Sequence, residues 1–82
     1  MTVYFIGYNL ARPGQSAKTL WDALTGLGAK RVQDTVWTMR SSSTAAQIRD
    51  QLWHYIGVGG SLLVIVSLDW AAWNPMSDVK SV

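Results

Sequence analysis

Residues 2–10 read Thr-Val-Tyr-Phe-Ile-Gly-Tyr-Asn-Leu, a run of β-branched and aromatic side chains that is apolar at both odd and even positions. Such a run is typical of a strand whose two faces are both buried, so we expect it at the centre of a sheet. It stops at Arg12-Pro13-Gly14, where proline and glycine together indicate a turn.

A helix is predicted next, over residues 17–27. Its apolar residues recur at intervals of three and four, which places them on one face: Ala17, Leu20, Leu24 and Leu27. Ser16 is positioned to cap the amino end of this helix, and Gly28 to end it in the left-handed conformation.

Two short stretches of β-type residues follow, at 30–33 and 36–39. Asp34-Thr35 between them suits a tight reversal, which predicts an antiparallel hairpin. A single long bent strand over the same residues is the alternative.

The second half of the chain returns to a helix and a strand. Residues 45–56 carry another helical stripe, preceded by capping hydroxyls at residues 41–44. Residues 61–68, Ser-Leu-Leu-Val-Ile-Val-Ser-Leu, form an apolar run of strand length that we expect to be buried at the centre of the sheet. One helical turn is predicted over residues 69–75.

The predicted order of elements is β-α-β-β-α-β. This is the order of the ferredoxin-like fold, an α+β architecture in which two helices cover one face of a four-stranded antiparallel sheet. We expect the first and last strands, which are the most apolar, in the middle of that sheet. Residues 1–75 form this single domain, and residues 76–82 form a polar C-terminal tail.

The composition leaves more apolar surface than so small a chain can bury. Of 82 residues, 49% are apolar and only 15% are charged, against about 25% charged in a typical soluble domain. A domain of this size buries only about 60% of the surface that its unfolded chain exposes. The helix-free face of the sheet therefore needs a cover, and we predict a homodimer in which a second copy packs on Tyr4, Ile6, Tyr8 and Trp37.

Several classes of function are excluded by what the sequence lacks. The absence of cysteine excludes disulfides, thiolate metal sites and a cysteine nucleophile. No catalytic residue and no metal-ligand set stands out, and we expect no small-molecule cofactor. The chain has no basic stretch typical of a signal peptide and no apolar run near the ~20 residues of a membrane span, so we expect a cytoplasmic protein without membrane contact.

The net charge of +2 permits contact with an anionic partner, but the basic residues are spread along the chain. The possible nucleic-acid contacts are Arg12, Lys30, Arg31 and Arg40. Trp37 with Tyr4 and Tyr8 resembles the sheet surface on which ferredoxin-like RNA binders stack bases. The strand around Trp37 lacks the glycine-aromatic signature of those binders, so burial of these rings in a dimer core is the favoured interpretation and nucleic-acid binding the alternative.

The chain resembles the small SinR-like proteins, part of a wider superfamily of ferredoxin-like CRISPR-associated integration subunits and virulence-associated toxin relatives. The resemblance covers about residues 2–74 and rests on Tyr8-Asn9-Leu10, Pro13-Gly14-Gln15, Asp34-Thr35-Val36-Trp37, Ser43-Thr44-Ala45, Ile48-Arg49-Asp50, the strand at 62–66 and Ala71-Ala72-Trp73. It implies the ferredoxin-like fold. It implies little about activity, because most SinR-like proteins have no established function.

Nuclease members of that superfamily end their first strand in Tyr-Asp, and the two aspartates of a homodimer hold a magnesium ion. This sequence has Asn9 at that place, and a neutral amide is a poorer ligand for Mg²⁺ than a carboxylate. The resemblance therefore implies that Asn9 marks a degenerate metal position, and capping of a turn is the simpler role for its side chain. The expected function is a non-catalytic homodimeric binding or scaffold protein of unknown partner. The alternatives are a nucleic-acid-binding protein and a metal-dependent endonuclease, and only the endonuclease would need Mg²⁺.

Overall fold

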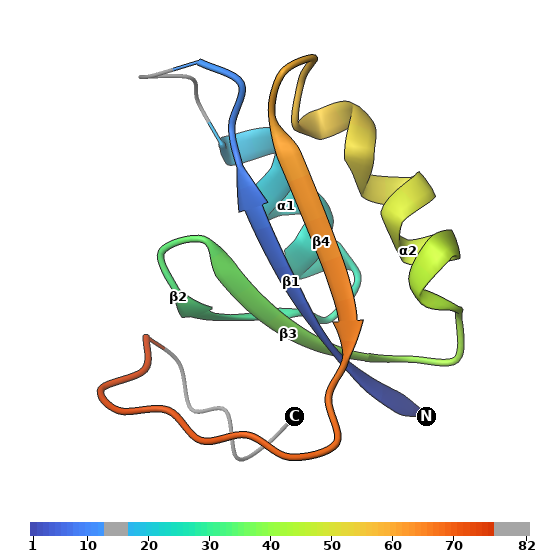
Figure 1. Ribbon diagram of the computed structural model, residues 1–82, viewed down its shortest axis with the longest axis vertical. Coiled ribbons are helices and arrows are strands. Elements are labelled where there is room, and N and C mark those ends of the chain that lie inside the picture. Colours follow the sequence, from blue (N-terminus) through green and yellow to red (C-terminus); the bar gives the residue numbers. More distant parts are fainter. Residues whose placement is uncertain (13–16, 77–82) are drawn as a thin grey trace.

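The structure is a computed structural model that describes residues 1–12 and 17–76. Its elements are β1 (Thr2–Asn9), α1 (Lys18–Gly26), β2 (Lys30–Gln33), β3 (Val36–Ser41), α2 (Ala45–Leu52), the 3-10 turn η1 (Trp53–Tyr55) and β4 (Ser61–Val66). The strands form one antiparallel sheet, as Figure 1 shows. The predicted α+β, ferredoxin-like βαββαβ fold is confirmed. The predicted cap Ser16, the Pro13-Gly14 turn and positions 77–82 of the predicted tail lie outside the described residues.

Local sequence signals set the ends of these elements. The hairpin from β2 to β3 turns at Asp34-Thr35, so the hairpin is confirmed and the single bent strand is excluded. Gly28 follows α1 with a φ of 82°, the left-handed conformation predicted for it. Before α2, Thr44 Oγ1 accepts a 3.1 Å hydrogen bond from Gln47 N–H, and Gln47 Oε1 accepts a 2.8 Å bond from Thr44 N–H. This reciprocal pair is a capping box, which satisfies two amides at the start of the helix.

The order of strands across the sheet is β2-β3-β1-β4. The central position predicted for β1 is confirmed, whereas the central position predicted for the last strand is wrong. The hairpin places β3 against one side of β1, and β4 takes the other side, as the last strand of the sheet that the described residues form. An apolar run therefore marked an edge strand, whose side chains Leu63 and Ile65 remain 59% and 46% exposed.

The residues predicted to form the dimer face lie on the opposite face of the sheet, which is a correction. Tyr4, Ile6, Tyr8 and Trp37 are each at most 6% exposed. They belong to the core that the helices cover, together with Leu20, Leu24, Ile48 and Leu52. Alternation along a strand tells which residues share a face, but not which of the two faces the helices cover. The helix-free face carries the intervening residues of β1, among them Phe5 and Gly7.

Residues 67–76, the C-terminal segment, turn back from the end of β4 and run beneath the β2–β3 hairpin in the view of Figure 1. The ring of Trp70 packs edge-on against Phe5, with 4.8 Å between centroids. At the far side of the sheet, Met76 N–H donates a 2.9 Å hydrogen bond to the carbonyl of Val32 in β2. The helical turn predicted for residues 69–75 is wrong, because this stretch holds bends and extended backbone instead. The segment thus contacts Phe5 in β1 and Val32 in β2, whereas Leu63 and Ile65 in β4 stay about half exposed.

Candidate functional site

Asn9, for which the resemblance implied a degenerate metal position, ends β1 with an exposed side chain. Its Nδ2 donates a 3.3 Å hydrogen bond to Ser61 Oγ at the start of β4. The two residues line a shallow depression of about 350 Å³, whose floor is opened by the missing side chain of Gly7. Among residues 1–12 and 17–76, no three His, Cys, Asp or Glu side chains come close enough to hold a metal ion together. The amide of Asn9 thus pairs two strand ends.

The four basic residues predicted to contact nucleic acid do not form one surface. Arg31 pairs with Trp37 across the hairpin and so lies on the helix side of the sheet. Lys30 and Arg40 lie on the other side, because their partners in register are Thr38 and Val3. Arg12 is exposed beyond the end of β1. The register therefore divides these cations between two faces.

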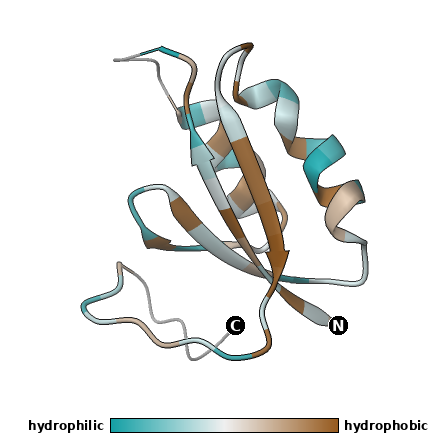
Figure 2. Ribbon diagram, viewed as in Figure 1, coloured by the Kyte–Doolittle hydropathy of each residue, from teal (hydrophilic) through white to brown (hydrophobic). Residues whose placement is uncertain are grey.

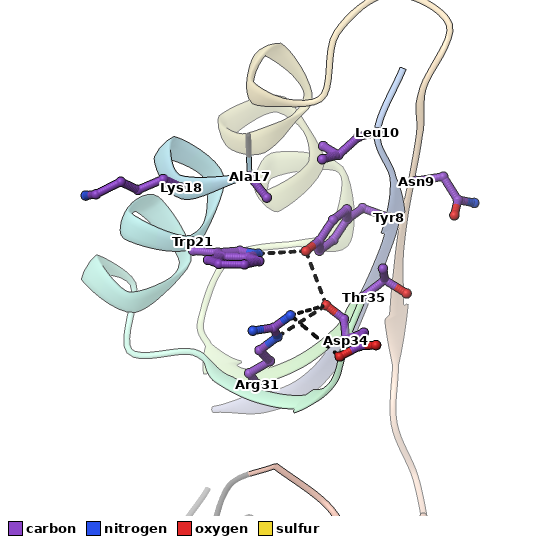
Figure 3. A pocket seen from close by; sticks show the side chains of 9 residues that line it. All are labelled: Tyr8, Asn9, Leu10, Ala17, Lys18, Trp21, Arg31, Asp34 and Thr35. Atoms are coloured by element: carbon purple, nitrogen blue, oxygen red, sulfur yellow. Dashed lines mark hydrogen bonds and ion pairs between the residues drawn. The ribbon is translucent and has the colours of Figure 1, made fainter. Parts of the chain in front are cut away.

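A pocket of about 500 Å³ opens between the end of β1, the start of α1 and the β2–β3 turn (Figure 3). Its inner wall is a chain of hydrogen bonds. The indole Nε1–H of Trp21 donates to Tyr8 Oη at 2.7 Å, and Tyr8 Oη–H donates to the carbonyl of Asp34 at 3.3 Å. The volume falls within the range of small-molecule sites, about 300–1,000 Å³.

Arg31 completes the same wall. Its Nε and Nη2 both donate to the carbonyl of Asp34, at 3.2 and 3.0 Å, and its guanidinium lies 4.3 Å from the ring centroid of Trp21. Only 25% of this side chain is exposed. An arginine held over an indole by two hydrogen bonds offers a well-positioned cationic group, which suits planar or anionic groups. Asn9 also borders the pocket, but in Figure 3 its side chain points away from it.

The outer rim of the pocket carries Lys18, the first residue of α1. Its Nζ donates a 2.8 Å hydrogen bond to Asp22 Oδ2, one turn further along the helix. That bond, with the attraction of the carboxylate, raises the pKa of the Lys18 amine above its ordinary value of 10.5. Because both side chains are exposed, this ion pair contributes little to the stability of the fold.

The second surface of interest is the free side of β4. Figure 2 shows β4 as hydrophobic along most of its length. Leu63, Ile65 and Val66 are 59%, 46% and 51% exposed. Between β4 and α2 runs a groove of about 250 Å³, where α2 contributes the small side chains of Ala45 and Ala46 together with Arg49.

Sequence reasoning missed both the pocket and the free edge. Trp21 lies four residues after Ala17, beside the predicted stripe of α1, and this spacing is the only local signal for its place in the pocket. The edge position of β4 could have been read from the ferredoxin-like order, in which the hairpin's second strand takes one side of β1.

No helix within residues 1–12 and 17–76 has the length and hydrophobicity needed to traverse a bilayer. No family model matches the sequence, and no solved structure matches the chain.

Proposed function

We propose that the protein is a non-catalytic homodimeric binding or scaffold module of the SinR-like group, cytoplasmic and with a partner of unknown identity. The homodimer no longer uses the face predicted from the sequence, because Tyr4, Ile6, Tyr8 and Trp37 are buried under the helices. Part of the exposed apolar surface lies instead on β4, at Leu63, Ile65 and Val66.

The exposure of Leu63, Ile65 and Val66 on β4 is the observation that carries the proposal. Leu63 and Ile65 share the helix-free face with Gly7 and Phe5 and stay about half exposed there, whereas Val66, which pairs with Tyr4, is half exposed on the opposite face. Burial of apolar surface stabilises by roughly 25 cal/mol per Å², so a second copy that packs against Leu63 and Ile65 removes part of their surface from water. Contiguous apolar surface of this kind marks an interaction site.

The non-catalytic part of the proposal is supported by Asn9. Its side chain is neutral, and its amide is already hydrogen-bonded to Ser61. The dispersal of Arg12, Lys30, Arg31 and Arg40 over two faces supports a scaffold in preference to a nucleic-acid binder.

Sedimentation equilibrium at micromolar concentration tests the homodimer. We expect twice the 9.1 kDa of the chain, and Ile65→Lys should dissociate the dimer because it places a charge in this apolar surface. Val58→Lys is the matched control, since Val58 is fully exposed in the loop before β4. A wild-type monomer under these conditions overturns the proposal.

The two alternative functions, endonuclease and nucleic-acid binder, can be tested on the same sample. Cleavage of RNA or DNA that a chelator abolishes would establish a metal-dependent endonuclease. Binding of single-stranded nucleic acid with an affinity that falls steeply with salt would establish a nucleic-acid binder. A dimer that shows neither behaviour supports the scaffold.

A further inference from the structure

We infer that a second copy of this chain joins the sheet edge to edge, with β4 antiparallel to the β4 of its partner and Val64 on the two-fold axis. This inference rests on the homodimer proposed above and specifies its interface. The two four-stranded sheets would then form one continuous sheet.

The pairing of β1 with its two neighbours shows which backbone groups of β4 are already bonded within the sheet. Ser67 N–H donates to the carbonyl of Val3 at 2.9 Å, and Tyr8 N–H donates to the carbonyl of Thr35 at 3.1 Å. Hydrogen-bonded and non-hydrogen-bonded pairs alternate along an antiparallel ladder. Odd-numbered residues of β1 therefore bond to β4, and even-numbered residues bond to β3.

The register between β1 and β4 then gives the orientation of each residue of β4. Leu63 and Ile65 face Gly7 and Phe5, so their N–H and C=O groups bond to β1. The backbone groups of Leu62, Val64 and Val66 point the other way, toward the side of β4 where residues 1–12 and 17–76 add no further strand. An edge of this kind is a template for another strand.

The strand β4 itself carries none of the side chains that block strand addition, and α2 lies beside it. The sequence from Ser61 to Val66 contains no charge and no proline. The pairing of β1 with β4 also runs without a register shift, whereas β2 and β3 are interrupted by one. Natural edge strands are protected by charges, proline or bulges, so β4 is the less protected of the two edges.

The identity of the occupant follows from the symmetry of the free groups. An antiparallel pair of identical strands is related by a two-fold axis perpendicular to the sheet, and opposed residues must then share a face. Placing Val64 on the axis opposes Leu62 to the partner's Val66, so all three outward-facing residues are hydrogen-bonded. The same register opposes Leu63 to the partner's Ile65 on the helix-free face, where both are exposed. A second copy thus satisfies the backbone groups and brings Leu63 and Ile65 of the two copies into contact on the helix-free face.

The groove beside β4 leaves room for this arrangement on the helix side. There α2 presents Ala45 and Ala46 next to Leu62 and Val64. Small side chains at these two positions let the partner's strand approach the edge. Ala46→Trp should therefore weaken dimerisation, although position 46 is exposed and lies outside the core.

The chain has no cysteine, so single-cysteine variants give a clean test of the register. In Val64→Cys the two thiols face each other across the axis, with Cα atoms about 5.5 Å apart in a hydrogen-bonded pair. This separation lies within the range for a disulfide, about 4.4–6.8 Å. Mild oxidation should convert most of this variant to a covalent dimer.

Val66→Cys is the matched control. The two copies of position 66 would be four residues apart along the strands, about 13 Å, and should stay uncrosslinked. As a second test on exposed positions, a mixture of Leu63→Cys and Ile65→Cys should form a covalent heterodimer, and neither variant alone should. Circular dichroism verifies that each variant is folded.

The outcomes separate the interface from the proposed function. A wild-type dimer with no disulfide at position 64 and none in the mixture overturns the edge-to-edge interface and leaves the homodimer standing. Equal crosslinking of Val64→Cys and Val66→Cys overturns it as well. A wild-type monomer overturns the proposed homodimer itself.

Discussion

The indole nitrogen of Trp21 in α1 lies 2.7 Å from the hydroxyl of Tyr8 in β1 and donates a hydrogen bond to it. The same hydroxyl donates to the carbonyl of Asp34 in the β2–β3 turn, at 3.3 Å. One phenol therefore connects the first helix, the first strand and the hairpin. This makes the wall of the pocket part of the fold as well as a surface for a ligand.

Tyr8→Phe should lower the free energy of unfolding by about 1–2 kcal/mol. It removes the hydroxyl that accepts from Trp21 Nε1–H and donates to the Asp34 carbonyl, so both groups lose this hydrogen-bond partner. Urea titration followed by circular dichroism gives the value. A double-mutant cycle with Trp21→Phe is the control: the two substitutions should cost less together than the sum of their separate effects. Additive effects would show that the two side chains are not coupled.

Gly60 lies where the chain enters β4, close to the backbone beyond the end of β1. A Cβ at this position would lie 2.6 Å from the carbonyl oxygen of Asn9 and 2.5 Å from Cγ2 of Ile56. Gly60→Ala should therefore cost about 1–3 kcal/mol through overpacking. The matched control is Gly26→Ala at the end of α1, where a Cβ meets nothing within 4 Å. It should be neutral or stabilise the protein by up to about 1 kcal/mol. Thermal unfolding of both variants tests whether the close approach of the backbone at Gly60 causes the difference in stability between them.

Thr44 and Gln47 cap α2 through two reciprocal hydrogen bonds. Thr44→Ala removes the hydroxyl that accepts from Gln47 N–H, and should cost about 1 kcal/mol. Thr19→Ala, at an exposed position inside α1, removes the same hydroxyl from a place where it caps nothing and should change the stability little. If both alanine variants unfold at the same urea concentration, the capping box does not stabilise α2.

Repeating patterns in the sequence were sufficient to predict the helices and strands, but not to predict where each lies in the fold. The spacing of Leu20 and Leu24, and of Ile48 and Leu52, predicted two helices whose buried residues are those four. The face of β1 that meets the helices could not be predicted, because Tyr4 and Phe5 are both large and apolar and only the helix crossovers distinguish them. The position of β4 was predicted wrongly for a similar reason. An apolar run fits a central strand and an unprotected edge strand equally well. The pocket at Trp21 joins three elements, so no local pattern contains it.

The contact between Trp70 and Phe5 could not be predicted from a local sequence pattern either. It holds the C-terminal segment against the helix-free face. Trp70→Ala should cost about 1–3 kcal/mol, since an edge-on aromatic pair contributes about 0.5–1.5 kcal/mol beyond the apolar area that it buries. The matched control is Trp73→Ala in the same segment, because Trp73 is 89% exposed and its loss should change stability by less than about 0.5 kcal/mol. Hydrogen exchange adds a local readout: in Trp70→Ala the Met76 amide, bonded to Val32 in the wild type, should exchange faster than in Trp73→Ala. Equal exchange of this amide in the two variants would show that Phe5 does not hold the segment against the sheet.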